Sequence, residues 1–372
     1  MAERRFRVGI VGLQPGRSWA ARAHVPALRS LPDEFEIAGV ANTTQKSAEA
    51  AAAATGVQRA FADVAELVAS PEVDIVAITV KVPHHVELVK AAIEAGKHVY
   101  CEWPLGNGLA EAQEMAGLAN AKGVLGVVGT QARMAPEIEY LRKLISEGYV
   151  GEVLSTTLTA RAGGWGAAID KQATGAYLLD RANGATMLTI PLGHTLAALR
   201  DVLGDVVELS ALLANRRSSV IALDTGQTLP MNAPDQVLVS AVLSSGAPLS
   251  IHYRGGAARG PIGLIWEING TEGDIRVTGP SGHAQMVQLL LEGGQGDDSE
   301  MKRLQVPASY RMDWPDDPII GNVARMYARM ADDLRDGSHT APSFDDAVEL
   351  HRFIDVVETA AEEGQRVSLQ LF

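Results

Sequence analysis

Short apolar runs alternate with amphipathic runs from residue 6 to residue 129, and this alternation restricts the folds available to the chain. Each apolar run is continuous, as in parallel strands that are buried on both faces of a sheet. Helices must then cover both faces. The expected strands are residues 6–13, 36–41, 73–80, 97–101 and 124–129, and the expected helices are 19–30, 47–55, 85–95 and 109–122. We therefore predict an α/β fold that begins with a doubly wound parallel sheet of the nucleotide-binding type.

After about residue 131 the pattern changes, because strand-like segments follow one another without helices between them. Such runs of strands favour an antiparallel or mixed sheet. The expected strands are 152–162, 206–215, 236–244, 249–253, 264–269 and 273–278, and the expected helices are 136–146, 187–203, 320–334 and 344–363. The Gly- and Asp-rich segment 292–299 is expected to be a mobile loop. We predict two domains: a dinucleotide-binding domain at 1–131, and an α+β domain at 132–372 with a large, open, mostly antiparallel sheet.

The charge balance and the single cysteine narrow the classes of partner and compartment. A formal net charge of −13 opposes binding to nucleic acid or to an anionic membrane surface. Cys101 is the one cysteine, which excludes an intrachain disulfide and favours a reducing compartment. We find no signal-peptide pattern and no apolar run as long as a membrane span, so we expect a cytoplasmic protein. Because His84 and His85 diverge at a strand–helix junction, we expect no metal site.

The turn after the first expected strand has the composition of a phosphate-binding loop. Glycine allows the backbone to approach a pyrophosphate, and the N-terminus of the next helix supplies unpaired N–H groups. The G-x-G-x-x-G pattern is incomplete, because Gln14 and Arg17 stand at its second and third glycine positions. We predict a nucleotide-binding turn of a Rossmann domain, with a plain strand–helix turn as the alternative. The residues expected to contact the cofactor here are Gly12, Leu13, Gly16, Arg17, Ser18 and Trp19.

The end of the second expected strand leaves the choice between NAD and NADP open. An acidic residue at this position would bind the adenosine 2′-hydroxyl and repel a 2′-phosphate. The chain has Asn42 there, which does neither strongly, followed by Thr43, Thr44 and Lys46, which can hold a phosphate. The pattern permits NADP and does not exclude NAD. The alternative interpretation is a polar loop that caps the next helix.

The segment from Ala95 to Leu105, AGKHVYCEWPL, carries the most specific resemblance to a known family. It is accompanied by GTQARMAP at 129–136, LISEGYVGEV at 144–153 and NGTEGDIRV at 269–277. Together these motifs resemble the glucose-fructose oxidoreductase / inositol dehydrogenase / rhizopine-catabolism (Gfo/Idh/MocA) family. Within that family, GWG at 164–166, GHT at 193–195 and PDQ at 234–236 are similar to the branch of the fungal galactose-regulon repressor.

The resemblance implies binding of NAD or NADP and oxidation of a hydroxyl, or reduction of a carbonyl, in a sugar or polyol. It also implies a catalytic Lys, Asp and His. At the matching positions this chain has Trp103 in place of the Lys, Ile190 in place of the Asp, and the expected His as His194. Trp has no proton to exchange at neutral pH, so part of the usual acid/base set is missing. Further cofactor contacts are expected from Val80, Lys81, His85, Glu102, Trp103 and Gln131.

His194 is the leading candidate for a catalytic residue, because an imidazole can accept or donate a hydrogen bond to a substrate hydroxyl near neutral pH. Lys81, Lys171, Tyr177 and Asp180 are candidates to replace the missing acid or base, although an ordinary surface role suits each of them as well. Five residues are expected to contact the substrate, which should be a polar ligand with an apolar or ring face. These are Arg133, Trp165, Lys171, Tyr177 and His194.

Three functions remain open from the sequence. The first is an NAD(P)-dependent dehydrogenase or reductase of a sugar-like or other hydroxylated small molecule, and we favour it. The second is a catalytically silent dinucleotide-binding protein that regulates a protein partner. The third is an enzyme that uses bound NAD in a reaction without net oxidation, such as glycoside cleavage. We also expect a homodimer or homotetramer formed through the C-terminal sheet, and no partner among nucleic acids or membranes.

Overall fold

The computed structural model describes residues 4–369, and these residues form two compact units. The first unit holds the described residues up to Met134 together with Asp313–His351. The second unit holds Ala135–Met312 and the described residues from Arg352 onward. The sequence placed all of 132–372 in one domain. The structure divides the chain differently, because Asp313–His351 returns to the first unit and the chain leaves that unit again within helix α10 (Phe344–Glu363).

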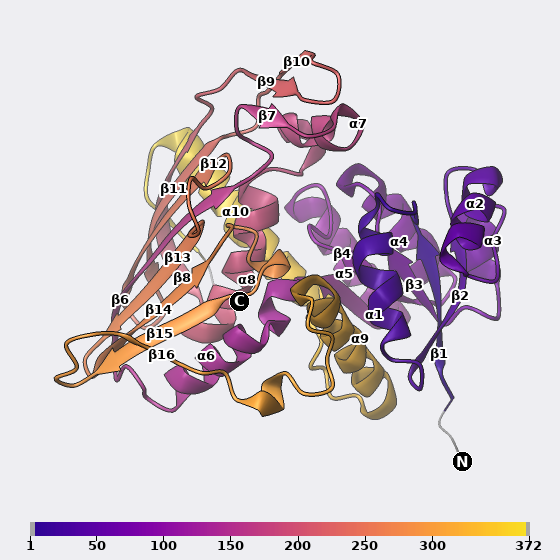
Figure 1. Ribbon diagram of the computed structural model, residues 1–372. Coiled ribbons are helices and arrows are strands. Elements are labelled where there is room, and N and C mark those ends of the chain that lie inside the picture. Colours follow the sequence, from indigo (N-terminus) through magenta and orange to yellow (C-terminus); the bar gives the residue numbers. More distant parts are fainter. Residues whose placement is uncertain (1–3, 370–372) are drawn as a thin grey trace. The chain divides into compact units, whose positions relative to one another are not determined.

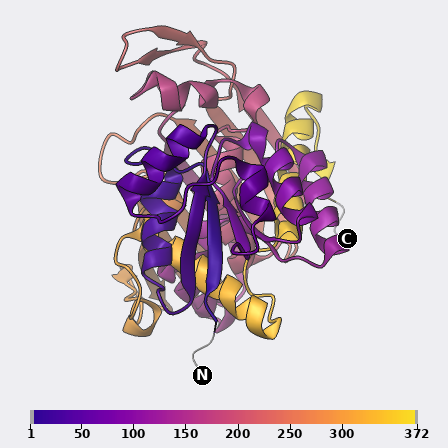
Figure 2. The ribbon, with the colours of Figure 1, turned by 90° about the vertical axis from the view of Figure 1, so that its right-hand side faces the viewer.

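In the described part of the first unit, five strands form one parallel sheet in the order β2-β1-β3-β4-β5. The strands are β1 (Phe6–Val11), β2 (Phe35–Ala41), β3 (Ile75–Ile78), β4 (His98–Glu102) and β5 (Gly126–Gly129). Its helices before residue 135 are η1 (Ala20–His24), α1 (Val25–Arg29), α2 (Gln45–Thr55), α3 (Val64–Ala69), η2 (Val82–His84), α4 (His85–Glu94), α5 (Leu109–Lys122) and η3 (Gln131–Met134). Figure 2 looks onto this unit and shows helices on either side of the strands. The predicted doubly wound sheet is confirmed.

Several helix ends in this unit are determined by local chemistry that is visible in the sequence. The Thr44 hydroxyl accepts a hydrogen bond from Ser47 N and caps the start of α2. Gly56 and Gly123, at the ends of α2 and α5, take the left-handed conformation that closes a helix and that only glycine adopts readily. Short-range signals of this kind explain why the predicted bounds of α5 agree with the structure.

The segment that returns to the first unit completes it on the β5 side. Helix α9 (Pro318–Asp336) packs against η1, α1 and η3. Val128 N donates a hydrogen bond of 2.9 Å to Pro342 O. A Cβ on Gly126 would lie 2.5 Å from Phe344 Cδ2, so only glycine lets the Phe344 ring approach β5 this closely. These contacts join residues far apart in the chain, and no short-range sequence pattern predicts them.

The second unit is built on a large mixed sheet with the order β16-β15-β14-β13-β6-β12-β11-β8-β17 among the described residues. Its neighbouring strands are antiparallel except for the pair β12 and β6. The strands are β6 (Val153–Ala162), β8 (Val206–Ala214), β11 (Gln236–Leu243), β12 (Pro248–Gly255), β13 (Leu264–Gly270), β14 (Gly273–Gly279), β15 (Leu290–Gln295), β16 (Lys302–Arg303) and β17 (Val367–Ser368). The predicted large, mostly antiparallel sheet is confirmed.

Helices α6 (Pro136–Ser146) and α8 (Gly193–Leu203) pack against each other, and Figure 1 shows them along one face of this sheet. A small sheet in the order β10-β9-β7 extends from the same unit. Its strands are β7 (Ala168–Ile169), β9 (Ser219–Ala222) and β10 (Thr228–Pro230). The short helices of the unit are α7 (Gln172–Gly175), η4 (Ala176–Leu179), η5 (Arg181–Asn183), η6 (Leu188–Leu192), η7 (Ala284–Met286) and η8 (Ala308–Tyr310).

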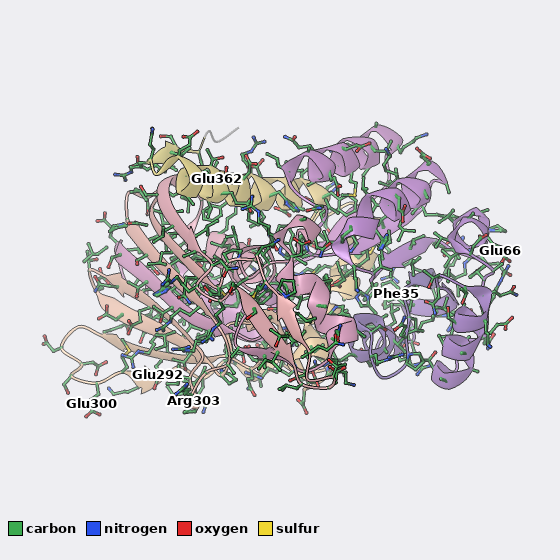
Figure 3. The ribbon with its side chains drawn as sticks, turned by 90° about the horizontal axis from the view of Figure 1, so that it is seen from above. Phe35, Glu66, Glu292, Glu300, Arg303 and Glu362 are labelled. Atoms are coloured by element: carbon green, nitrogen blue, oxygen red, sulfur yellow. The ribbon has the colours of Figure 1, made fainter. Side chains whose placement is uncertain are left out.

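The prediction of a loop at 292–299 is wrong for its first four residues. They belong to β15, which pairs with β14 and places Glu292 opposite Arg303 of β16; both side chains are labelled in Figure 3. A Cβ on Gly293 would lie 2.9 Å from Tyr149 Oη, so this glycine makes room for a neighbouring ring. Glycine here permits close packing within the sheet, whereas the composition alone resembled a loop.

No helix among the described residues combines the length and the apolarity that crossing a membrane requires.

Candidate functional site

The carboxyl ends of the parallel strands in the first unit collect most of the predicted cofactor residues. Gly12 follows β1, Asn42 follows β2, Val80 comes two residues after β3, Glu102 ends β4, and Gln131 lies just beyond β5. Ligands of open α/β sheets bind at this edge, beside the strand where the order of the sheet changes direction. In this sheet the change occurs at β1, because β2 lies on one side of it and β3 on the other.

The turn after β1 has the glycine geometry that a nucleotide-binding loop needs. Gly12 has φ +100°, and a Cβ there would lie 2.7 Å from Val80 Cγ1. Gly16 has φ +69°, and a Cβ there would meet no heavy atom of the described residues within 4 Å. The Ser18 hydroxyl accepts hydrogen bonds from Gln14 N at 2.8 Å and Ala21 N at 3.3 Å, so it builds the turn itself. Glycine at Gly12 therefore serves close packing, and glycine at Gly16 serves the backbone conformation.

Three side chains of the same turn differ in their exposure to solvent. Leu13 is buried and Arg17 is exposed. The indole Nε1 of Trp19 is buried and has no hydrogen-bond partner among the described residues. A buried donor without an acceptor is unusual in a folded protein, because leaving it unpaired costs about 1–3 kcal/mol. The indole of Trp19 thus leaves one buried donor of the turn unpaired among the described residues.

At the end of β2, the amide of Asn42 is held in one orientation. Its Nδ2 donates to Leu13 O at 2.8 Å and to Ser47 O at 3.1 Å. Its Oδ1 is buried without a partner among the described residues. Turning the amide over would place Oδ1 against two carbonyl oxygens, so Asn42 presents an acceptor to its surroundings. Thr43 and Lys46 are exposed, while the Thr44 hydroxyl is engaged in capping α2.

The Glu102 carboxylate is held by a buried network inside the first unit. Gln131 Nε2 donates to both carboxylate oxygens, at 2.9 and 2.8 Å, and His24 Nε2 lies 2.8 Å from Oε1. His24 Nδ1 lies 2.8 Å from the hydroxyl of Tyr327, a residue of α9. Burial and the nearby carboxylate raise the pKa of Tyr327 well above its usual value, so the hydroxyl keeps its proton. The simplest assignment has Tyr327 donating to Nδ1 and Nε2–H donating to Glu102.

His85 has a structural place beside this edge. Its Nδ1 lies 2.9 Å from Pro104 O and its Nε2 lies 3.1 Å from Val80 O. Burial lowers the pKa of His85, while the hydrogen bonds to these carbonyls act in the opposite direction. The ring therefore ties the turn after β3 to the segment after β4. It supports the predicted cofactor edge through the backbone.

Trp103, at the position of the family's Lys, is a packed side chain with only 5% of its surface exposed. Its ring centroid lies 4.7 Å from that of His351, which also belongs to the first unit. His351 Nε2 faces Gly106 N at 3.5 Å, and burial, with a contribution from His85, lowers the pKa of His351 to about 4. Both rings are uncharged at neutral pH. Neither supplies the positive charge of a Lys.

Two further predicted residues of the first unit have other surroundings. Arg133 pairs with Asp346 at 3.3 Å, and Lys81 is exposed at the start of η2. Arg133 thus joins η3 to the beginning of α10 within the unit.

In the second unit, His194 lies at the start of α8 and is buried, with 4% of its surface exposed. Its Nδ1 has no partner among the described residues. Burial, with a contribution from the nearby His283, lowers the pKa of His194 to about 3. His194 is therefore a neutral imidazole at physiological pH, with a nitrogen available to a hydroxyl group.

Trp165 and His283 surround the same part of the second unit. Their rings stack with centroids 6.3 Å apart and an interplanar angle of 18°. Trp165 is buried, and its Nε1 donates to Leu178 O at 2.9 Å. Burial lowers the pKa of His283, whose Nδ1 is also without a partner among the described residues. The structure thus places a second neutral imidazole near His194.

The three remaining predicted residues of the second unit differ in exposure and in hydrogen bonding. Lys171 is exposed and precedes α7. Tyr177 is half-buried in η4, and burial raises its pKa. Asp180 is exposed, accepts hydrogen bonds from Ala182 N and Asn232 Nδ2, and caps η5. Hydrogen bonding to these groups lowers the pKa of Asp180, so it is a weak base in this setting.

Sequence reasoning missed His24, Tyr327, His351 and His283. None belongs to a motif, and each reaches its partner through contacts between distant parts of the chain. No local signal in the sequence sets these four rings apart from other histidines and tyrosines. No group of three or more His, Cys, Asp or Glu side chains among the described residues has the arrangement of metal ligands.

Comparison with known proteins adds two family matches and close relatives of two kinds. Residues 6–130 match the oxidoreductase family with the NAD-binding Rossmann fold, and residues 136–279 match the C-terminal domain of Gal80p. The galactose/lactose metabolism regulatory protein GAL80 of Kluyveromyces lactis is 28% identical over 308 residues, which are 78% of this chain and 67% of that protein. Dehydrogenase aclE of Aspergillus oryzae is 29% identical over 377 residues, 98% of each chain.

Among solved structures, a super-repressor mutant of Gal80p from Saccharomyces cerevisiae has a TM-score of 0.90 and 25% identity, covering 98% of each chain. The parallel sheet with its glycine turn agrees with the first family match, and the large mixed sheet agrees with the second. Residues 6–130 therefore form an NAD-binding Rossmann domain of the Gfo/Idh/MocA oxidoreductase type, and residues 136–279 form a domain similar to the C-terminal domain of Gal80p.

Proposed function

We propose that the protein is an NAD-dependent dehydrogenase or reductase of a hydroxylated small molecule, and that His194 binds the reacting hydroxyl or carbonyl. The observation that carries this proposal is the buried, neutral His194, whose Nδ1 has no partner among the described residues. An unpaired ring nitrogen in a buried position costs free energy unless a ligand or water meets it. A hydroxyl group meets it as a donor, and a protonated Nδ1 would meet a carbonyl as a donor in turn.

In this proposal His194 orients the substrate by a hydrogen bond and does not take up its proton. A pKa of about 3 means that the imidazole is a poor proton acceptor at neutral pH. Bound NAD would supply the hydride acceptor. The hydroxyl proton must then reach a base, and the exposed Lys81 and Lys171, acting as neutral amines, are the proposed replacements for the missing Lys. Tyr177 is proposed as a hydrogen-bond donor, because its raised pKa keeps the hydroxyl protonated.

We further propose NAD rather than NADP as the cofactor. Asn42 offers an acceptor at the end of β2, and its two bonds to Leu13 O and Ser47 O prevent the amide from turning. A ribose 2′-hydroxyl can donate to Oδ1, whereas a 2′-phosphate has only acceptors and carries negative charge. The Thr44 hydroxyl, which could bind a phosphate, is engaged by Ser47.

Calorimetric titration with NAD and NADP tests the cofactor proposal. We expect NAD to bind at least about tenfold more tightly, which corresponds to about 1.4 kcal/mol. Asn42→Ala should reduce this preference, because it removes the Oδ1 acceptor. Equal or tighter binding of NADP would overturn the choice of NAD while leaving a dinucleotide site in place. Binding of neither cofactor would refute the proposed function as a whole.

A screen of sugars, polyols and aromatic alcohols for NADH formation tests the reaction. Turnover that falls at least about a hundredfold in His194→Asn supports His194 as a substrate-binding residue. His252→Asn is a matched control, because His252 lies on β12 in the same unit and is half-buried. Equal losses in both variants would point to a general effect on folding and against the assignment of His194.

A second function is favoured by one observation. Trp103 is buried against His351, so the position of the family's Lys holds a packed, uncharged ring. A regulatory protein that binds NAD without catalysing a reaction needs the cofactor-binding edge of the parallel sheet. It needs no acid/base group. NAD binding together with no turnover on any compound of the screen would favour this regulatory function over the dehydrogenase.

A further inference from the structure

A cavity of about 600 Å³ lies in the first unit at the amino ends of its parallel strands. Its lining residues are Arg4, Phe6, Arg7, Pro71, Val73, Asp74, Gly96, Lys97, His98 and Arg335, and we call it the amino-edge cavity. Phe6 begins β1, Asp74 precedes β3, and His98 begins β4. The predicted cofactor residues follow the opposite, carboxyl ends of the same strands. The amino-edge cavity is therefore separate from the cofactor site.

The lining of the amino-edge cavity is basic although the whole chain carries a net charge of −13. Arg4, Arg7, Lys97 and Arg335 are cationic, and Asp74 is the one carboxylate in the lining. Burial alone would raise the pKa of Asp74, but hydrogen bonds from Arg7 and the charge of Arg4 outweigh it and lower the pKa. Asp74 is thus ionised at neutral pH, and it pairs with both Arg4, at 2.7 Å, and Arg7, at 2.9 Å, so its single charge offsets one of the two. Arg335 is paired with Glu34, outside the lining.

Two of these cations are held in place by hydrogen bonds to the protein and keep further N–H groups for a ligand. Arg7 Nε and Nη2 donate to Asp74 at 3.0 and 2.9 Å, and Nη2 also reaches Pro71 O at 2.7 Å. Lys97 Nζ donates to Ser70 O and Val73 O, both at 2.8 Å. An ammonium has three N–H groups, so one of Lys97 is left after the two acceptors found among the described residues. The Arg7 and Lys97 side chains are therefore fixed in place before any ligand binds.

The pKa of Lys97 reflects its burial and the two charged groups near it. Burial lowers its pKa, and the nearby Arg7 lowers it further, while Asp74 acts in the opposite direction. The ammonium is held among backbone carbonyls and other cations without a carboxylate of its own. An anion placed in the cavity would be attracted by Lys97, Arg7 and Arg4 together.

We propose that the amino-edge cavity is a binding site for the phosphoryl group of a small phosphorylated molecule. A phosphoryl group carries more charge than a carboxylate and has three oxygens for the converging donors of Arg7, Lys97 and Arg4. The volume exceeds what a phosphate ion fills, which leaves space for a small organic part. The net charge of −13 on the whole chain opposes binding of nucleic acid, so a small phosphorylated molecule fits the site better.

Isothermal titration with inorganic phosphate and with glycerol 3-phosphate tests this site. The full chain is first saturated with NAD, so that phosphate cannot be counted at the cofactor edge, and ionic strength is matched with NaCl. We expect glycerol 3-phosphate to bind with 1:1 stoichiometry and more tightly than inorganic phosphate. Lys97→Met should weaken its binding at least about tenfold, which is about 1.4 kcal/mol. Lys122→Met is the matched control, since Lys122 is an exposed lysine at the end of α5 in the same unit.

Lys97 also supports the segment at Ser70 and Val73, so a second variant keeps the test independent of folding. The Arg4 side chain is 71% exposed, and Arg4→Gln removes its charge with little risk to the fold. We expect a loss of several-fold in Arg4→Gln with an unchanged melting temperature. Heat no larger than that of matched NaCl, or equal affinities in all variants, would refute the site. Tighter binding of inorganic phosphate than of glycerol 3-phosphate would refute a phosphorylated organic ligand.

Discussion

The His194 imidazole illustrates how burial decides the chemistry of a single residue. Its pKa falls to about 3 because burial disfavours the charged form, and His283 adds to the effect. In the unfolded chain the same ring titrates near its ordinary value of 6.5. Between these two values the unfolded state binds one more proton than the folded state. Stability from this group is therefore complete above pH 6.5 and is lost as the pH falls toward 3.

Acid unfolding tests this reasoning at the residue scale. We expect the free energy of unfolding to fall by about 1.4 kcal/mol per pH unit for each such histidine below about pH 6.5. His351, with a pKa of about 4, contributes in the same direction. Urea titrations at about pH 7 and about pH 5 measure the change. His194→Asn should lose less stability between these pH values than the unmodified protein; an equal loss would contradict the shifted pKa of His194.

Trp103 gives a second prediction for a single residue. Trp103→Lys restores the family's Lys but removes the ring that packs on His351 and buries an ammonium in its place. We expect the free energy of unfolding to fall by roughly 3–5 kcal/mol, as for other losses of a large buried ring. Urea denaturation measures it, with Trp103→Phe as the milder comparison. Unchanged stability in Trp103→Lys would mean that the indole is not a packing residue.

At the scale of one element, the turn after β1 separates two roles of glycine. A Cβ at Gly12 would meet Val80 Cγ1 at 2.7 Å, whereas the surroundings of Gly16 are open. Both have positive φ, so an alanine costs about 1–2 kcal/mol of backbone strain at either. We expect Gly12→Ala to weaken NAD binding at least about tenfold and Gly16→Ala to weaken it less. Calorimetry gives the affinities and circular dichroism checks the fold; the reverse order would contradict this account of the turn.

The elements also show where local pattern suffices. Helix α6 occupies the predicted residues 136–146, because Pro136 stands at its first position and its apolar residues recur at helical spacing. By contrast, α3 (Val64–Ala69) was not predicted, although Asp63 caps its start. Six residues are too few for a clear period. Strand β15 was missed because its glycines read as loop signals, whereas they admit the Tyr149 ring.

At the scale of the whole molecule, one row on a face of the large sheet contains three apolar side chains and two polar ones. Leu212 pairs with Leu238, and Leu238 pairs with His252 across three adjacent strands. Leu212 is 57% exposed, and the row continues from His252 through Thr159 to Ile265 on the same face. Exposed apolar rows on a sheet favour association with another subunit.

We therefore expect the protein to form a homodimer or homotetramer through this face. Light scattering of Leu212→Lys combined with Leu238→Lys should give a lower mass than the unmodified protein. Leu223→Lys is the control, because Leu223 is 64% exposed but lies beside the small sheet. A monomeric unmodified protein, or an unchanged mass in the double variant, would contradict assembly through the sheet face.

The sequence by itself determined the alternation of strands and helices, the glycine turn after β1, and the family through its spaced motifs. These features are local, because periodicity, capping and turn chemistry act over a few residues. Only the tertiary structure brought Tyr327 to His24, His351 to Trp103, and His283 near His194. It also returned Asp313–His351 to the first unit. Such contacts join residues far apart in the chain, and burial at these contacts, rather than residue type, decides whether an imidazole is charged or a carboxylate is held in place.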